Sequence, residues 1–167
     1  MSLKLKPRVL FAVMLMFRLM VGFVVLVWSP YSILSAHPGR PVAELMPLTV
    51  AGVLLMGAGG IGYLWCVWDF AFTGLSFSPG MLLARGIYGY VRHPMYSSSM
   101  AVVLGESLFF KSWRLLGYAA AGAVLLNLLV ILYEEPAMVK KWGAGYREYA
   151  ARVPRWIPRI PKPELHG

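Results

Sequence analysis

Long apolar runs decide which folds are open to this chain. Hydrophobic residues make up 59% of its 167 positions and charged residues only 14%, whereas a soluble domain carries about a quarter charged residues. Several runs approach the ~20 apolar residues that a helix needs to cross a hydrocarbon core ~30 Å thick. The sequence therefore predicts an integral membrane protein, folded as a single domain over residues 1–167.

The predicted fold class is all-α: a membrane bundle of about four transmembrane helices, followed by an amphipathic C-terminal helix. Pro30, with the prolines and the glycine that follow it, is expected to break the chain after the first span. The tail beyond Pro154 is rich in proline and cannot be helical throughout. The predicted segments are four spans near residues 9–28, 45–68, 94–110 and 115–133, a connection over 69–91, and the amphipathic helix over about 135–152.

Lysine and arginine gather on one side of this predicted bundle. Four spans place both termini on the same side of the membrane, and loops rich in lysine and arginine favour the cytoplasm. That side would carry Lys4, Lys6, Arg8, Arg85, Arg92, Lys140, Lys141, Arg147, Arg152, Arg155, Arg159 and Lys162. The other side would carry only Arg40, Lys111 and Arg114. We therefore expect both termini in the cytoplasm. The net charge of +9 follows from these flanking residues, so no nucleic-acid partner is predicted.

Two polar groups flank the third and fourth predicted spans. Arg92, His93 and Tyr96 open the third span, and the pair Glu134-Glu135 closes the fourth. The short turn at Lys111–Arg114 makes these spans antiparallel neighbours, so both groups reach the same, cytoplasmic, face of the membrane. Ionisable side chains at membrane depth are costly and usually functional. An ion pair that only anchors the helix ends is the alternative, but this cluster exceeds what anchoring requires, and we interpret it as an active site.

Other patterns in the spans favour structure over chemistry. Residues 57–62 match the GxGxxG dinucleotide fingerprint, but that motif needs a preceding strand and a following helix in a soluble unit. Glycines in a membrane span let helices approach closely, so we predict helix packing here. Asn127 is expected to hydrogen-bond to a neighbouring helix, and Ser97–Ser99 to serve packing or backbone bonding.

The remaining candidates for chemistry are predicted to be structural as well. Glu106 stands close to Lys111, and we expect its carboxylate to be solvated or paired with that lysine. No set of Cys and His residues has metal-ligand spacing, so no metal site is predicted. The single cysteine, Cys66, permits no internal disulfide and is expected to be a packed thiol.

At the polar cluster the chain resembles the isoprenylcysteine carboxyl methyltransferase and phospholipid methyltransferase superfamily of membrane enzymes. Gly86–Tyr96 resembles the family's G-x-Y-x-x-x-R-H-P-x-Y stretch, and Glu134-Glu135 resembles its paired glutamates. Its C-terminal signature is matched by Trp142-Gly143, Tyr146, Tyr149 and Arg152–Pro154. The three elements occur in order, and the resemblance covers about residues 73–158, the expected cofactor-binding part of the domain.

The resemblance implies S-adenosyl-L-methionine as the methyl donor, held between the last two spans and the C-terminal helix. Its zwitterionic amino acid and its sulfonium need carboxylate, cation and aromatic partners. Carried over by position, the cofactor-binding residues would be Tyr88, His93, Pro94, Met95, Tyr96, Glu134 and Glu135, with Leu82 and Leu83 in a stretch that supplies backbone contacts. Glu134 would engage the amino-acid moiety. The expected catalytic residues are His93, Glu134 and Arg92.

The methyl acceptor is expected to be lipophilic and to come from the bilayer. Eukaryotic carboxyl methyltransferases of the superfamily carry an arginine one helical turn before the first glutamate, and Val130 stands there in this chain. This departure weakens the case for a prenylcysteine carboxylate and favours a lipid or isoprenoid-like acceptor that enters sideways between helices. Transfer to an amine or hydroxyl needs a base, which His93 or a glutamate would supply; transfer to a carboxylate needs none.

Two other functions remain open at the level of the sequence. An NADPH-dependent membrane sterol or lipid reductase would resemble this family around an Arg-His-x-x-Tyr motif, with Arg85 and Arg92 as its basic groups. A small non-catalytic membrane protein would use the polar cluster for assembly alone. The identity of the acceptor, the atom that receives the methyl group and the oligomeric state are left open.

Overall fold

The computed structural model describes residues 15–16, 19–36, 46–73 and 86–159. Within these ranges the chain forms helices and turns and has no extended β-strand, so the predicted all-α class is confirmed. The elements in chain order are a π-helical turn η1 (Val24–Trp28), α2 (Ser29–Ala36), α3 (Met46–Thr73), a 3₁₀ turn η2 (Gly86–Gly89), α4 (Pro94–Phe109), α5 (Trp113–Leu129), a second π-helical turn η3 (Val130–Glu134), α6 (Glu135–Trp142) and α7 (Ala144–Arg152).

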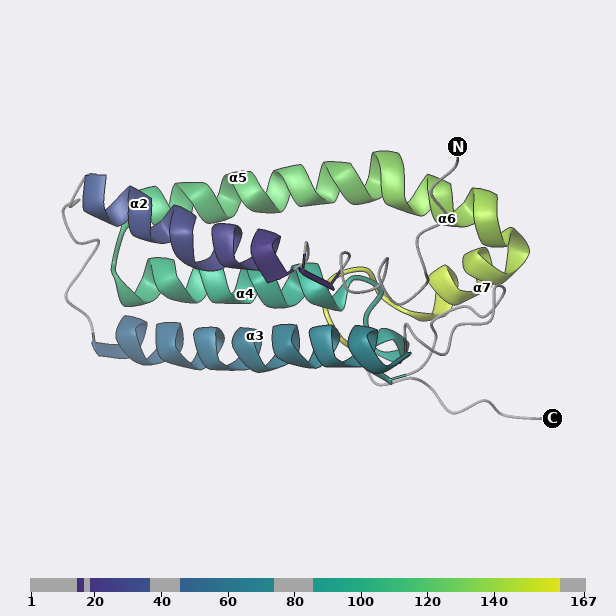
Figure 1. Cartoon of the computed structure of the whole chain (residues 1–167), viewed down its shortest axis with the longest axis horizontal. Helices are drawn as coiled ribbons and strands as arrows, with labels where there is room; N and C mark the ends of the chain where they lie inside the picture. Colours follow the sequence, from purple (N-terminus) through teal and green to yellow (C-terminus); the bar gives the residue numbers. More distant parts are fainter. Residues whose placement is uncertain (1–14, 17–18, 37–45, 74–85, 160–167) are drawn as a thin grey trace, which may run out of the picture.

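The helices run up and down along one long axis. Figure 1 shows α3, α4 and α5 side by side, with α2 in front of α4 and α5. α4 packs against α3 on one side and α5 on the other, and α2 also contacts α5. The end of α3, the start of α4 and the junction of α5 with α6 all lie at one end of the bundle. We call this the polar end, because it carries the Arg92–Tyr96 stretch and the glutamate pair.

Within the described residues, three helical stretches are long and apolar enough to cross a membrane: Leu19–Ala36, Met46–Asp69 and Trp113–Trp142. The remaining predicted span, α4, has 16 residues, which gives a helix about 24 Å long at 1.5 Å per residue. It is shorter than a ~30 Å hydrocarbon core and is held between two longer helices. The chain is therefore an integral membrane protein in which α4 is an inner, shorter member of the bundle.

The predicted break at Pro30 is wrong, because the first helix continues through this proline to Ala36. A proline inside a helix removes a backbone hydrogen bond and crowds the carbonyl group four residues earlier. Here a wider π-helical turn precedes it, with the Ser29 N–H donating to the Val24 carbonyl. The same device recurs at Pro136, where the Glu135 N–H donates to the Val130 carbonyl. Each proline is thus accommodated without ending its helix.

The boundaries of two other predicted segments also change. The connection expected over residues 69–91 begins later, since α3 continues to Thr73, and it contains η2. The amphipathic helix expected over 135–152 is two helices, because Gly143 has a positive φ of 58° that separates α6 from α7. α6 continues the line of α5, and α7 turns back toward the polar end. Of the first predicted span, over residues 9–28, residues 9–14 and 17–18 lie outside the described residues.

Glycines let α3 and α4 pack with their backbones almost in contact. A Cβ atom on Gly52 would lie 2.7 Å from the Gly105 carbonyl oxygen, and one on Gly105 would lie 2.7 Å from the Gly52 carbonyl oxygen. In the GxGxxG stretch, Gly59 and Gly62 face Ser98 in the same way, whereas Gly57 and Gly60 have open space around them. The packing interpretation is therefore confirmed for two of these glycines, which lie inside a continuous helix.

We predict that Gly59→Ala destabilises the protein and that Gly57→Ala does not. The new Cβ at position 59 would lie 2.7 Å from the Ser98 carbonyl oxygen, and overpacking of this kind costs about 1–3 kcal/mol. The measurement is the thermal unfolding of the purified protein in detergent. Gly57→Ala is the matched control, because it makes the same change two residues away in open space. Equal melting temperatures for both variants would contradict the packing.

Candidate active site

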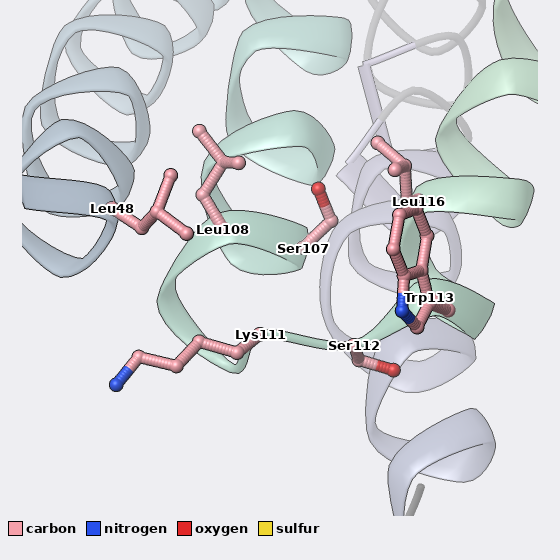
Figure 2. Close-up of a pocket in the computed structure, with 7 residues that line it drawn as sticks. All are labelled: Leu48, Ser107, Leu108, Lys111, Ser112, Trp113 and Leu116. Atoms are coloured by element: carbon pink, nitrogen blue, oxygen red, sulfur yellow. The ribbon is translucent and has the colours of Figure 1, made fainter. Parts of the chain in front are cut away.

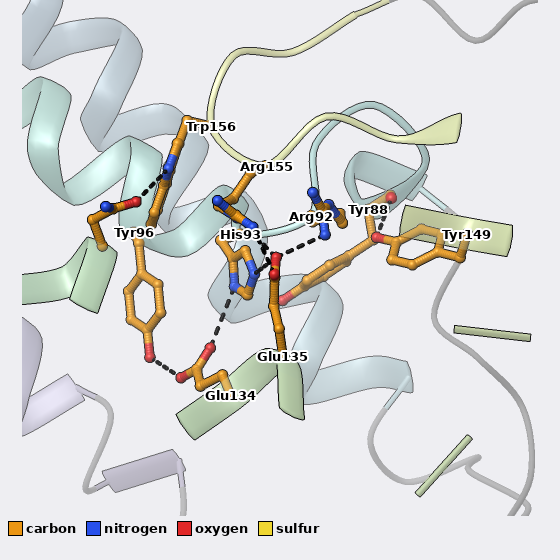
Figure 3. Close-up of polar contacts among 10 residues, drawn as sticks. Tyr88, Arg92, His93, Tyr96, Glu134, Glu135, Tyr149, Arg155 and Trp156 are labelled. Atoms are coloured by element: carbon orange, nitrogen blue, oxygen red, sulfur yellow. Dashed lines mark hydrogen bonds and ion pairs between the residues drawn. The ribbon is translucent and has the colours of Figure 1, made fainter. Parts of the chain in front are cut away.

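The polar end of the bundle brings two separate stretches of sequence together. His93 is the residue just before α4, and Pro94 occupies the first turn, where a missing N–H costs nothing. Glu134 ends η3, and Glu135 begins α6. The turn at the opposite end, in which Lys111 has a φ of 52°, makes α4 and α5 antiparallel. The expected meeting of the histidine stretch with the glutamates is therefore observed (Figure 3).

Glu135 binds two arginines at once. Its Oε1 accepts hydrogen bonds from Arg92 Nη1 at 2.7 Å and from Arg155 Nε at 2.8 Å, and its Oε2 accepts one from Arg155 Nη2 at 2.7 Å. The carboxylate side chain is only 16% exposed. The bond to Glu135 raises the pKa of Arg155 above its usual value. Glu135 is thus fully engaged within the protein and ties α6 to the start of α4 and to the C-terminal segment.

Glu134 faces a different set of partners. Its Oε1 accepts a short hydrogen bond from the Tyr96 hydroxyl, and its Oε2 lies 3.3 Å from His93 Nδ1. The Glu134 side chain is 32% exposed, twice as much as that of Glu135. Glu134 is therefore the glutamate that a ligand can reach.

The His93 imidazole lies between the two carboxylates. Its Nε2 is 3.8 Å from Glu135 Oε1, is buried, and makes no hydrogen bond within the described part of the chain. The Tyr96 ring is nearly parallel to it, with ring centres 6.0 Å apart, and the Trp156 ring is 5.6 Å away. A buried nitrogen without a hydrogen bond is unfavourable in a protein interior, and it marks a position where a ligand group would be stabilised.

An extended segment that follows α7 completes the site; we call Val153–Arg159 the C-terminal strap. Its backbone runs beside the start of α4: Arg92 N–H donates to the Pro154 carbonyl at 2.8 Å and His93 N–H to the Arg155 carbonyl at 3.3 Å. The Ser97 hydroxyl donates to the Trp156 carbonyl at 2.7 Å. The strap thereby places Arg155 and Trp156 in the cluster (Figure 3).

The strap is joined to α5 and to α7 as well. The Trp156 indole N–H donates to Asn127 Oδ1 at 3.2 Å, so Asn127 bonds to the strap and not, as predicted, to a neighbouring helix. Tyr146, Tyr149 and Val153 form a small buried core, and the Tyr149 hydroxyl donates to the Tyr88 carbonyl at 2.8 Å. Burial raises the pKa of Tyr149, which keeps this donor protonated at neutral pH.

The structure brings most of the predicted site residues into one cluster. Arg92, His93, Tyr96, Glu134 and Glu135 are in contact, and Tyr88 is held beside them by Tyr149. Pro94 is buried in the first turn of α4, and the Met95 carbonyl accepts a hydrogen bond from Ser99 within that helix. Leu82, Leu83 and Arg85 lie outside the described residues.

Arg155, Trp156 and the role of Asn127 in the site are not predicted from the sequence. The C-terminal signature was recognised as far as Pro154, but a proline-rich tail has no periodicity that shows which side chains turn inward. An arginine and a tryptophan directly after that signature were the available signal.

The prediction for Glu106 is wrong. Its side chain is buried in α4, and its Oε2 makes no hydrogen bond within the residues that the structure describes, so the carboxylate is neither solvated nor paired with Lys111. Cys66 is buried, as expected. Ser97 and Ser99 bond to backbone carbonyls, also as expected.

Comparison with known proteins places this site in a family. The phospholipid methyltransferase family matches residues 48–145, a range that includes α4, α5 and both glutamates. The chain is 34% identical over 88 residues to the protein-S-isoprenylcysteine O-methyltransferase of Schizosaccharomyces pombe, covering 48% of this chain and 34% of that protein. It is 26% identical over 144 residues to the cobalt-zinc-cadmium resistance protein CzcN of Cupriavidus metallidurans, covering 86% of this chain and 64% of that protein.

The matched range and the helical site together define the class: an α-helical membrane protein whose polar end carries a histidine and a glutamate pair. The chain belongs to the phospholipid methyltransferase family. It spans about a third and just under two thirds of the lengths of the two relatives.

We predict that Glu135→Gln lowers the stability of the protein much more than Glu148→Gln. Breaking a buried ion pair costs about 3–5 kcal/mol, and Glu135 holds two arginines. Glu148 pairs with Arg152 on an exposed surface, where such a pair contributes about 0–1 kcal/mol. Thermal unfolding in detergent measures both. If the melting temperature of Glu135→Gln equals that of the Glu148→Gln control, the ion pairs of Glu135 with Arg92 and Arg155 do not stabilise the fold.

Proposed function

We propose that this protein is an S-adenosyl-L-methionine-dependent methyltransferase that acts on a lipophilic acceptor from the bilayer. Membership of the phospholipid methyltransferase family supports methyl transfer. The observation that carries the proposal is the different environment of the two glutamates. Glu135 is bound by two arginines, whereas Glu134 is more exposed and contacts His93 and Tyr96.

The residues at the polar end fit the proposed cofactor. A methionine ammonium group needs an accessible carboxylate, which Glu134 offers, and a sulfonium is favoured next to aromatic faces, which Tyr96 and Trp156 offer. The buried His93 Nε2, which has no hydrogen bond in the described chain, is free to meet a polar group of the ligand. Tyr88, Pro94 and Met95 flank this cluster in sequence and would line the same pocket. Glu135 would keep the surrounding segments in place through its two arginines.

The protein's own part in the reaction would be positioning and proton transfer. The cofactor supplies an activated methyl group, so the residues have to align donor and acceptor and exclude water. Arg92 would act by holding Glu135 and the start of α4 in place. If the acceptor is an amine or a hydroxyl, the His93–Glu134 pair, at 3.3 Å, is in position to accept its proton.

The membrane placement of the site favours an acceptor from the bilayer. The stretch Met46–Asp69 ends at the polar end, and Trp113–Trp142 carries the glutamates in its last third, so the cluster lies near a lipid–water boundary. Val130, at the position where eukaryotic carboxyl methyltransferases carry an arginine, is fully buried. A lipid or isoprenoid-like acceptor with a neutral or basic reactive group therefore suits this site better than a carboxylate does.

We predict that the purified protein binds S-adenosylhomocysteine and that Glu134→Gln and His93→Ala each weaken this binding about tenfold or more, since a hydrogen bond to a charged group contributes about 1.5–3 kcal/mol. Isothermal titration in detergent measures the affinity. Glu148→Gln, on the exposed face of α7, is the matched control and should bind like the unaltered protein.

Titration with NADPH separates the rival functions in the same experiment. Binding of NADPH without binding of S-adenosylhomocysteine would replace the proposal with a membrane reductase. A folded protein that binds neither, and whose Glu134→Gln variant is altered only in assembly, would be a non-catalytic membrane protein.

We also propose that the polar end faces the cytoplasm. Lys140, Lys141 and Arg147 lie at that end, whereas Lys111 and Arg114 lie at the other, and positive charge favours the inner side. An impermeant maleimide applied to intact cells should label Arg114→Cys and not Lys140→Cys, and both should react after lysis. Cys66 is buried and contributes little background. Labelling of Lys140→Cys in intact cells would reverse the orientation.

A further inference from the structure

Helices α4 and α5 are joined by different means at their two ends. At the end away from the site, residues 110–112 form a short covalent turn, and the Ser112 hydroxyl accepts a hydrogen bond from the Leu115 N–H at 3.4 Å. A cavity of about 60 Å³ remains beside this turn, lined by Ser107 of α4 and Leu116 of α5 among other residues (Figure 2). At the polar end the chain does not pass directly from one helix to the other, so side chains have to set the distance between them.

Direct packing along the two helices leaves that distance loosely defined. Between the turn and the polar end, α4 and α5 border an apolar space of about 240 Å³. Its walls include Met100 of α4 and three alanines of α5, Ala119, Ala120 and Ala123. An alanine side chain is too short to interlock with the opposite helix, and methionine adapts to gaps of different shape. The separation of the polar ends therefore depends on contacts beyond this space.

Trp156 of the C-terminal strap makes such contacts with both helices. Its carbonyl oxygen accepts a hydrogen bond from the Ser97 hydroxyl of α4 at 2.7 Å, and its indole N–H donates to Asn127 Oδ1 of α5 at 3.2 Å. Its ring lies next to that of His93, with ring centres 5.6 Å apart and planes tilted by 39° (Figure 3). Trp156 therefore connects the start of α4 to α5, and it borders the imidazole at the same time.

Asn127 holds the indole at membrane depth. Trp113 is 63% exposed and Tyr133 is 70% exposed, and the two are separated by about 30 Å at 1.5 Å per residue. Aromatic residues gather at both boundaries of a hydrocarbon core ~30 Å thick, so these two residues mark the boundaries on this helix. Asn127 precedes Tyr133 and lies about 9 Å inside the nearer boundary. An amide or an indole N–H is costly there without a partner, so Asn127 and Trp156 satisfy each other.

We propose that Asn127 is a positioning residue: by holding the Trp156 indole, it keeps His93 at the start of α4 aligned with Glu134 at the far end of the neighbouring helix. The inference rests on the proposed function, in which this pair meets the cofactor. His93 Nδ1 lies 3.3 Å from Glu134 Oε2, and a small outward shift of either helix end would take the two atoms beyond hydrogen-bonding reach. Without the Asn127 acceptor the indole N–H is left unpaired, and the ring leaves its place beside the imidazole.

A double-mutant cycle tests whether the two side chains act as a unit. Asn127→Leu removes the acceptor and keeps the size of the side chain, and Trp156→Phe removes the donor and keeps a ring. Each should weaken the binding of S-adenosylhomocysteine about fivefold, because one polar group loses its partner. The double variant should recover affinity relative to Asn127→Leu, since it leaves no polar group unpaired and coupled residues are not additive. Isothermal titration in detergent measures all three variants.

Tyr118→Phe is the matched control. It also removes one hydrogen bond of α5, the one that the Tyr118 hydroxyl donates to the Val25 carbonyl at 3.2 Å, but away from the site. It should lower the melting temperature about as much as Asn127→Leu does and leave the affinity for S-adenosylhomocysteine unchanged.

Hydrogen exchange without ligand gives a second readout, which does not depend on the proposed function. The Arg92 and His93 N–H groups donate to carbonyls of the strap, so they exchange faster when the strap is no longer held. Their exchange should be severalfold faster in Asn127→Leu and unchanged in Tyr118→Phe. If Asn127→Leu does not fold, Trp156→Phe takes its place in this comparison.

The outcomes separate the inference from the proposed function. Affinity losses that add up in the double variant, an equal loss in Tyr118→Phe, or unchanged exchange of the two amides in Asn127→Leu overturns the positioning role. An unaltered protein that binds S-adenosylhomocysteine no better than background overturns the proposed methyltransferase instead, and hydrogen exchange then still decides whether Asn127 holds the strap in place.

Discussion

The site depends on one carboxylate that is shared by two arginines. Glu135 joins the first turn of α6 to Arg92, just before α4, and to Arg155 in the C-terminal strap. A buried ion pair is costly when it is incomplete, so these three segments hold together as a unit. Because Glu135 is occupied in this way, the neighbouring Glu134 keeps its side chain toward His93 and Tyr96. The ion pairs of Glu135 thus hold the three segments together, and these segments position Glu134 and His93.

The parts of the fold that rest on hydropathy and on short-range chemistry were predictable. The long apolar runs indicated an all-α membrane protein, and the turn near Lys111 correctly made α4 and α5 antiparallel, which brought His93 to the glutamates. The helix passing through Pro30 was not predictable from proline rules, because the π-helical turn that accommodates it has no sequence signal of its own. The break at Gly143 was missed for a related reason: a glycine in an amphipathic pattern does not show that it will adopt a positive φ.

Most of the candidate site is identifiable from motifs, and the rest only from the tertiary structure. Arg92, His93, Tyr96 and the glutamates were identifiable since ionisable groups beside apolar runs are rare. Arg155 and Trp156 were not, because they belong to an extended segment whose hydrogen bonds to Tyr90, Arg92 and His93 form only when the chain has folded back on itself. Glu106 was misjudged since sequence proximity to Lys111 says nothing about which way a helical side chain points.

The π-helical turn η3 has a consequence for how this protein can change over evolution. Such a turn holds one residue more than an α-helical turn, and it ends at the glutamate pair. Deleting one residue of α5 could be absorbed by converting η3 into an ordinary turn, leaving the length of the helix and its membrane span almost intact. Because the π-helical turn holds the extra residue, its loss would leave Glu134 and Glu135 facing almost the same direction relative to the helix before them. A deletion in a helix without such a turn would instead rotate the residues beyond it by about 100°. The turn η3 therefore lets the length of α5 change by one residue without displacing the glutamate pair.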